Sequence, residues 1–196
     1  MYKSRPFIFS LIALFLFSFK ADKPDSVIDY LSIGDSITFN QKEYHLIWSS
    51  NPVQNYCKQE YLPDSSSLDN YHDMIIVEAI KGNLSIDDAL NVKIQEVNES
   101  SKKSHFMIPW KVYPGENEKV INFCISDGGS VYEWNLYRYI KQKNKKGEYL
   151  VLCAFSYRDS LLTNEDRQSF INRITEDGDN YVKALLEVKI PQVKIK

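Results

Sequence analysis

Four segments between residues 106 and 157 alternate apolar and polar side chains, and only turn-forming residues separate them. The expected strands are 106–113, 118–126, 130–141 and 148–157. Pro114 and Gly115 separate the first two strands, Gly128 and Gly129 the next two, and a basic loop ending at Gly147 the last two. Strands joined by such short links pair with their neighbours in antiparallel fashion. The chain is therefore expected to build its core on an antiparallel sheet.

A hairpin and a third strand are expected near the N-terminus. Strands at 36–39 and 43–50 flank a polar turn, and a strand at 56–62 ends at Pro63. Alternate residues of a strand point to the same face. Three apolar side chains of the second strand are therefore expected to share one face: Tyr44, Leu46 and Trp48.

Three helices are expected beside these strands. The first covers 68–81, where apolar residues recur at helical spacing after Ser67 as N-cap. The second begins after Ser85, and the third begins after Thr163 and carries Gly178, which predicts a kink or a break. Strands and helices are grouped separately along the chain. This grouping predicts the α+β class, with a mostly antiparallel sheet and helices packed on at least one face.

The N-terminus has the form of an export signal. Lys3 and Arg5 precede an apolar segment at 7–19, which has the length of a secretory core and is too short to span a bilayer comfortably. We therefore expect a signal peptide at 1–21 and a single domain at 22–196, located in the periplasm or secreted. Contact with a membrane is expected only through this N-terminal segment, if it is not cleaved.

Composition and charge exclude several classes of protein. Aromatic residues make up 13% of the chain, which is high for a disordered protein, and a formal net charge of −2 without a basic block argues against a nucleic-acid partner. Cys57, Cys124 and Cys153 lie in strand-like segments and form no CxxC motif. We interpret them as small buried side chains, with one disulfide as the alternative. No catalytic residue, metal or cofactor is assigned.

The expected strand at 130–141 carries the most informative side chains. One face holds the better core residues: Tyr132, Trp134, Leu136, Arg138 and Ile140. The other face is polar and aromatic, and an earlier strand supplies similar groups. The candidate binding residues are Lys58, Glu60, Glu133, Asn135, Tyr137 and Tyr139. Such a surface suits recognition of a peptide, a glycan or a partner protein, because tyrosines combine a large rigid area with a polar tip. The alternative is a buried network of ion pairs and tyrosines.

The segment 31–39, Leu-Ser-Ile-Gly-Asp-Ser-Ile-Thr-Phe, resembles the first block of the GDSL/SGNH hydrolases. The resemblance implies that Ser36 is the nucleophile of a secreted esterase. The GxND block of that family has no counterpart here, and its DxxH pattern occurs only from Asp69 to His72. The alternative interpretation is a glycine turn that leads into a hairpin strand.

Three further segments resemble a group of uncharacterised exported bacterial envelope proteins. They are 48–52 (WSSNP), 56–63 (YCKQEYLP) and 131–139 (VYEWNLYRY). The element order is also similar to that of the PsbP/Mog1-like antiparallel sandwiches, although a shared fold does not determine function. The first resemblance implies an exported protein and carries over no activity. We expect an exported, non-enzymatic protein that binds a partner in the cell envelope, in an accessory or immunity-like role. The esterase based on Ser36 is the alternative.

Overall fold

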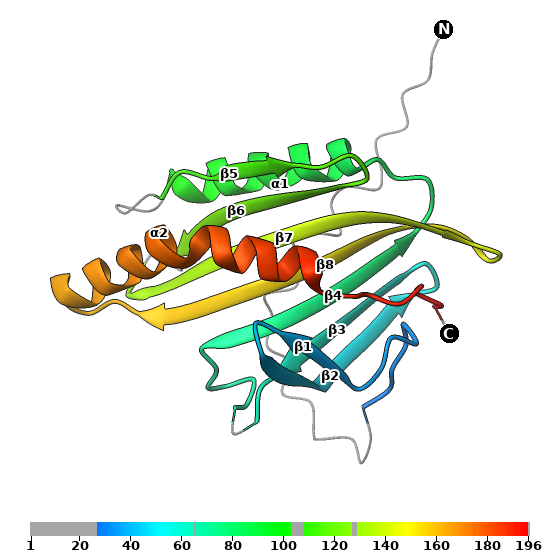
Figure 1. The fold of residues 1–196 in the computed structure, drawn as a ribbon, viewed down its shortest axis with the longest axis horizontal. Coiled ribbons are helices and arrows are strands. Elements are labelled where there is room, and N and C mark those ends of the chain that lie inside the picture. The colour runs from blue at the N-terminus through cyan, green and yellow to red at the C-terminus, as the bar shows by residue number, and fades with distance from the viewer. Residues whose placement is uncertain (1–26, 65, 103–107, 127–128, 196) are drawn as a thin grey trace, which may run out of the picture.

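One eight-stranded antiparallel sheet organises the chain, in the computed structural model that describes residues 27–64, 66–102, 108–126 and 129–195. The strands are β1 (Ser36–Phe39), β2 (Lys42–Val53), β3 (Tyr56–Leu62), β4 (Asp73–Lys81), β5 (Lys111–Pro114), β6 (Glu118–Ser126), β7 (Val131–Asn144) and β8 (Gly147–Ser160). The helices are α1 (Ile86–Ser101) and α2 (Asn164–Glu187), and they lie on opposite faces of the sheet (Figure 1). The expected α+β class is therefore right. The expected signal peptide at 1–21 lies outside the described residues.

Each half of the chain forms a four-stranded meander followed by a helix. The strand order is β1-β2-β3-β4-β8-β7-β6-β5, so the two meanders join where β4 pairs with β8. This central pairing runs from Asp73 opposite Tyr157 to Lys81 opposite Tyr149. As a result, β3 from the first half and β7 from the second half lie on either side of the β4–β8 pair.

The expected helix at 68–81 is wrong, because most of this segment forms β4. In the middle of the sheet, β4 is covered on both faces, and Met74, Ile75, Ile76 and Val77 are all buried. A strand buried on both faces has no alternation of apolar and polar residues. A short apolar segment therefore does not distinguish a strand from a helix by its periodicity.

A β-bulge changes the expected faces of β2. Leu46 lies opposite Tyr61, but Trp48 lies opposite Glu60, and the register shifts between these two pairs. Tyr44 and Leu46 face the core under α2, as expected. The extra residue of the bulge turns Trp48 to the other face, where its ring centroid is 5.9 Å from the Lys58 ammonium.

The three cysteines are free thiols in or beside the core. Burial raises the pKa of the Cys57 thiol to about 11 and those of Cys124 and Cys153 to about 12. A thiol that stays protonated at neutral pH is a poor nucleophile and a poor metal ligand. These residues therefore act as small packing side chains, and the alternative of a disulfide is not formed.

Both helices begin at the expected caps. The Ser85 side chain accepts a hydrogen bond from the Asp88 backbone, and Thr163 and Asp166 form a reciprocal capping box. The prediction of a helix break at Gly178 is wrong, because α2 continues through this residue. Neither of these helices is long and apolar enough to cross a membrane, within the part of the chain that the structure describes.

We expect Gly178→Ala to stabilise the protein. A Cβ atom at Gly178 would lie 3.8 Å from the Trp134 ring and 3.9 Å from the Asn122 amide, which is ordinary van der Waals contact. Alanine in a helix interior is about 0.5–1 kcal/mol more favourable than glycine, so the melting temperature should rise by roughly 1–4 °C. Gly115→Ala is the control that should destabilise, because its Cβ would lie 2.6 Å from the Glu118 carbonyl oxygen. A lower melting temperature for Gly178→Ala would contradict this account.

Candidate functional site

A cavity of about 340 Å³ lies between α1 and the sheet, and we call it the α1 cavity. Its polar and aromatic lining residues are Tyr56, Lys58, Glu78, Lys93, Glu96, Ser100, Phe123, Glu133, Tyr137 and Tyr139. The size falls within the range of small-molecule sites, at its lower end. The floor comes from five strands of both meanders, and the roof is the inner face of α1. The site therefore exists only when the two halves of the chain are joined.

Strand register builds the floor of the cavity. Lys58 lies opposite Glu78, Glu78 opposite Leu152, and Leu152 opposite Tyr139. Directly opposed residues of antiparallel strands share a face. Four adjacent strands thus present one row that contains an ammonium, a carboxylate, an apolar side chain and a phenol.

The structure brings four of the six candidate binding residues into the cavity wall: Lys58, Glu133, Tyr137 and Tyr139. The other two candidates support this wall. Glu60 forms an ion pair with Lys58 at 2.8 Å. Asn135 is fully buried, and its Oδ1 accepts a hydrogen bond from Ser156 at 2.5 Å.

Aromatic rings form one wall of the α1 cavity. The Phe123 and Tyr137 rings meet edge to face, with centroids 4.9 Å apart. The Lys93 ammonium of α1 lies 5.1 Å from the Tyr137 centroid and 5.9 Å from the Phe123 centroid. Burial raises the pKa of the Tyr137 and Tyr139 phenols, and neither hydroxyl forms a hydrogen bond with another described residue. Both phenols are neutral donors that face the cavity.

The charges in the cavity are unevenly paired. Both lysines have carboxylate partners, since Lys58 pairs with Glu60 and Lys93 pairs with Glu96 at 2.6 Å. Burial and the nearby Glu78 carboxylate raise the pKa of the Tyr56 phenol, but Glu78 forms no ion pair within the described residues. Lys58 also lies directly opposite Glu78 and is attracted by it. Two ammonium groups therefore face four carboxylates, those of Glu60, Glu78, Glu96 and Glu133, and the net charge at the cavity is negative.

Glu133 is a second carboxylate without an ion pair among the described residues. Its cross-strand partner is Arg158, whereas Arg138 lies on the other face of β7 and binds Glu118. Burial raises the pKa of Glu133, while the Asn135 side chain and the charge of Arg158 act in the opposite direction. Burial is the largest of these effects, so the ionised side chain lowers the stability of the folded state.

We expect Glu133→Gln to raise the melting temperature at about pH 8 and to have little effect near pH 4. Because the folded state has the higher pKa, its stability falls as the pH rises from the unfolded pKa through the folded pKa. Glutamine removes this cost. Thermal melts across this range test the sign. Asp166→Asn is the control and should have the opposite effect, a lower melting temperature at about pH 8. The reason is that hydrogen bonds at the Thr163 cap lower the pKa of Asp166, so its ionised form stabilises the folded state.

Sequence reasoning missed several residues of the α1 cavity. Glu78 was assigned to a helix, but the structure places it in β4. It is the one charged residue in the apolar segment 74–80, and a single charge in a buried strand is the pattern that could have marked it as a functional position. Lys93 and Glu96 lie beside the inward-facing Val97 of α1. Their position on the inner face becomes informative only when the helix is placed on the sheet.

Ser36 of the GDSL-like block begins β1, directly opposite His45. The His45 ring lies 3.3 Å from the Asp64 carboxylate, and both side chains are exposed. No hydrogen bond joins Ser36 to His45 within the described part of the chain. The residues before Ser36 instead attach the N-terminal loop to the core. The Leu31 backbone N–H donates to the Gln59 side-chain oxygen at 2.7 Å, and the Tyr61 hydroxyl donates to the Gly34 carbonyl oxygen at 3.1 Å.

We expect Ser36→Ala to change the free energy of unfolding by less than about 1 kcal/mol and to leave binding unchanged. The reason is that no base among the described residues is hydrogen-bonded to the Ser36 hydroxyl to remove its proton. Hydrolysis of a short acyl ester by the wild type and the variant is the measurement. An esterase activity that disappears with this substitution would instead support the hydrolase alternative.

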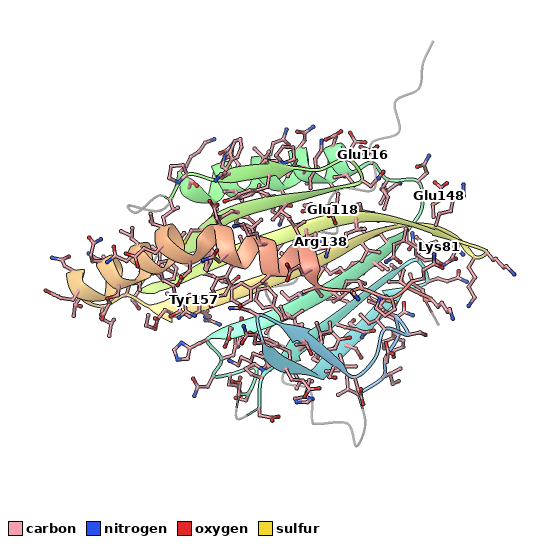
Figure 2. All side chains as sticks on the ribbon, in the orientation of Figure 1. Lys81, Glu116, Glu118, Arg138, Glu148 and Tyr157 are labelled. Carbon is pink, nitrogen blue, oxygen red and sulfur yellow. The ribbon has the colours of Figure 1, made fainter. Side chains whose placement is uncertain are left out.

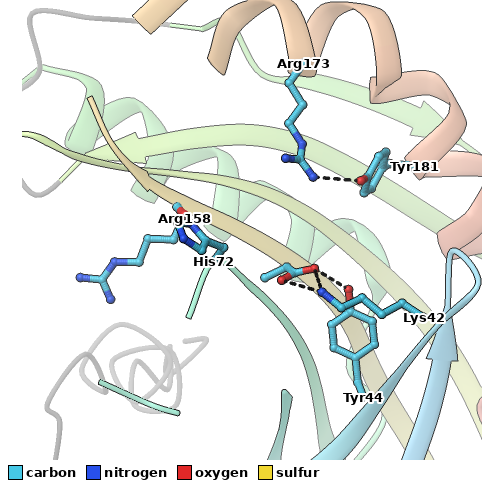
Figure 3. A network of polar contacts seen from close by, with 7 residues as sticks. Lys42, Tyr44, His72, Arg158, Arg173 and Tyr181 are labelled. Carbon is cyan, nitrogen blue, oxygen red and sulfur yellow. Dashed lines mark hydrogen bonds and ion pairs between the residues drawn. The ribbon is translucent and has the colours of Figure 1, made fainter. Parts of the chain in front are cut away.

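A second polar cluster lies on the α2 face of the sheet (Figure 3). Asp73 accepts from the Lys42 ammonium and from the Tyr44 hydroxyl, each at 2.9 Å. On α2, Arg173 donates to Tyr181 at 3.2 Å, and its guanidinium lies 3.9 Å from the Tyr157 ring centroid. These contacts attach the β1–β2 hairpin and α2 to the centre of the sheet, so we assign them a structural role.

No group of three or more His, Cys, Asp or Glu side chains is arranged to hold a metal ion within the ranges that the structure describes. No curated protein and no solved structure matches the chain. The model of a family of uncharacterised proteins matches residues 31–190, from the buried Leu31 through the end of α2. The chain therefore belongs to this family.

Proposed function

We propose that the chain is a non-enzymatic binding protein of the cell envelope, periplasmic or secreted, which recognises its partner through the α1 cavity. The observation that carries this proposal is the row formed by Lys58, Glu78, Leu152 and Tyr139 across four strands. Polar and aromatic side chains that converge on one cavity are typical of a recognition site. An accessory or immunity-like role is consistent with such a site.

The absence of an activated nucleophile near the cavity supports a binding role over an enzymatic one. The burial-raised pKa values of the three thiols keep them protonated, and Ser36 lies on the β1–β2 hairpin, outside the residues that line the cavity. A nucleophile needs a base within hydrogen-bond reach. The described residues offer no such pair in the α1 cavity.

Filling the cavity tests the proposed site. In a pull-down from a periplasmic extract with the tagged mature chain, Ala89→Phe should abolish capture, because Ala89 lines the cavity from α1. Asn91→Phe is the matched control, since it puts the same ring on the exposed face of the same helix. The captured molecule is identified by mass spectrometry. Equal capture by Ala89→Phe and wild type would show that the cavity is not the recognition site.

Export is the second part of the proposal. Its support is the basic start at Lys3 and Arg5 and the apolar segment 7–19, which have the physical form that export machinery recognises. Cell fractionation should find the chain outside the cytosol, shortened by about 21 residues when the signal is cleaved. Full-length protein in the cytosolic fraction would contradict export.

We also propose a relationship to the PsbP/Mog1-like sandwiches. Its support is an antiparallel sheet that carries a helix on each face. This relationship adds no site residue, because fold alone does not define function.

A further inference from the structure

We propose that the α1 cavity receives an organic ammonium group, which is held between the Tyr137 ring and the Glu78 carboxylate. This inference rests on the proposed function and names the chemistry of the ligand. The ligand carries a positively charged nitrogen and a short apolar part. The cavity has aromatic rings and a carboxylate to receive the charged nitrogen, and apolar side chains to receive the apolar part.

The sign of the ligand charge follows from the pairing inside the cavity. Lys58 and Lys93 are both neutralised by glutamates at 2.8 and 2.6 Å, so neither is available to bind an anion without losing its partner. Glu78 lies half-buried in a central strand, directly opposite Lys58 on one side and Leu152 on the other. Glu78 and Tyr139 both lie directly opposite Leu152, and Glu78 lines the same cavity as the Tyr137 and Tyr139 rings. A cation is the ligand that compensates this carboxylate.

The chain itself demonstrates that an ammonium is stable against this aromatic wall. The Lys93 Nζ atom lies within 5.9 Å of both the Phe123 and Tyr137 ring centroids while it pairs with Glu96. The face of an aromatic ring attracts a cation through its quadrupole, and the attraction grows when water is excluded. Lys93 therefore competes with an incoming ammonium for the same rings.

The remainder of the cavity suits the apolar part of such a ligand. Ile80, Leu150, Leu152 and Val97 line it beside the charged groups. The Tyr139 side chain is only 6% exposed, and its hydroxyl is available to a polar substituent of the ligand. A cavity of about 340 Å³ limits the ligand to a small molecule or to one inserted side chain.

Choline and its uncharged isostere 3,3-dimethylbutan-1-ol test the role of the charge. The two probes have the same shape, so a difference in affinity measures the contribution of the ammonium. We expect choline to bind the full mature chain at least about 10-fold more tightly, as measured by ligand-observed NMR titration. Glu78→Gln, which keeps the shape of the side chain and removes its charge, should weaken choline binding by about 5-fold or more. Glu116→Gln on the exposed β5–β6 turn is the control and should have no effect.

Removing the internal competitor gives a second, opposite effect. Lys93→Met keeps the apolar stem and removes the ammonium, so choline affinity should increase by about 3-fold or more. Lys102→Met is the matched control, because Lys102 forms the same i,i+3 ion pair with Glu99 in an exposed position. An increase in both variants would indicate a general charge effect, and a decrease in Lys93→Met would overturn the competition.

The ammonium has two possible sources, and two more probes distinguish them. Nα-acetyl-lysine methylamide represents a lysine side chain of a partner protein, and its norleucine analogue is the uncharged control. Tighter binding of the lysine probe than of choline identifies a partner side chain, and the reverse identifies a free organic cation. Either result supports the inference if the uncharged analogue binds more weakly.

The outcomes separate this inference from the proposed function. Equal binding of choline and its isostere, lost in Ala89→Phe, would overturn the ammonium chemistry and leave the cavity as the recognition site. Choline binding that persists in Ala89→Phe would place the cation elsewhere and overturn both. No binding of either charged probe up to about 50 mM, to wild type or to Lys93→Met, would also overturn the inference.

Discussion

Trp134→Ala is expected to lower the free energy of unfolding by about 3–5 kcal/mol. Trp134 is fully buried, and its ring centroid lies 5.9 Å from Phe155 and 5.3 Å from Tyr181. Alanine leaves a cavity between β7 and α2 that these rings cannot close. The substitution also removes the donor of the 2.7 Å hydrogen bond from the indole to Asn122. Asn122 is itself buried, which adds to the cost.

Thermal or urea unfolding measures this loss. For a chain of this size, the melting temperature should fall by about 6–20 °C. Trp134→Phe is the control, because it keeps an aromatic ring and removes only the indole N–H and part of the volume, so its loss should be smaller. A loss below about 1 kcal/mol for Trp134→Ala would contradict the packing described here.

Arg138→Met is expected to cost about 3 kcal/mol or more. Arg138 lies on β7 beside the C-terminal end of α2, next to Glu118 (Figure 2). Its guanidinium binds the Glu118 carboxylate at 2.6 Å and donates to the Leu185 and Val188 carbonyl oxygens at 2.8 Å. The last turn of α2 carries no basic residue, so Arg138 supplies the positive charge that a helix C-terminus prefers.

The loss in Arg138→Met arises from the groups that remain. Methionine leaves Glu118 with an uncompensated charge and removes the guanidinium donor from the Leu185 and Val188 carbonyl oxygens, of which Leu185 keeps the 3.3 Å bond from the Val188 backbone. The double variant with Glu118→Gln should therefore recover part of the stability, which a double-mutant cycle measures. Arg167→Met on the exposed first turn of α2 is the control with no expected loss. An equal loss in the single and double variants would contradict the account.

Local sequence patterns determined the elements whose ends or faces are chemically distinct. The strand Glu118–Ser126 and the caps at Ser85 and Thr163 were predicted at the residues where the structure has them. Turn residues, capping side chains and one-sided alternation act between neighbours in the chain. They therefore remain readable without any knowledge of the tertiary structure.

The errors in the prediction occurred where tertiary packing determines the type of element or the face to which a side chain points. The segment of β4 is buried on both faces, and its apolar side chains suit either a helix or a central strand. The break expected at Gly178 is absent, because α2 continues through the glycine, which is buried against the sheet beside Trp134. The bulge that turns Trp48 to the opposite face depends on the register with β3, which no local pattern records.

The candidate site shows the same division between sequence and tertiary structure. The alternation of β7 determined by itself that Glu133, Asn135, Tyr137 and Tyr139 share a face, because this depends only on the period of a strand. Only the tertiary structure decided that this face forms a cavity wall, since β3 and β4 reach it through the pairing of β4 with β8, and α1 covers it from outside. These contacts join residues far apart in the chain, and the sequence pattern of either partner carries no record of the other.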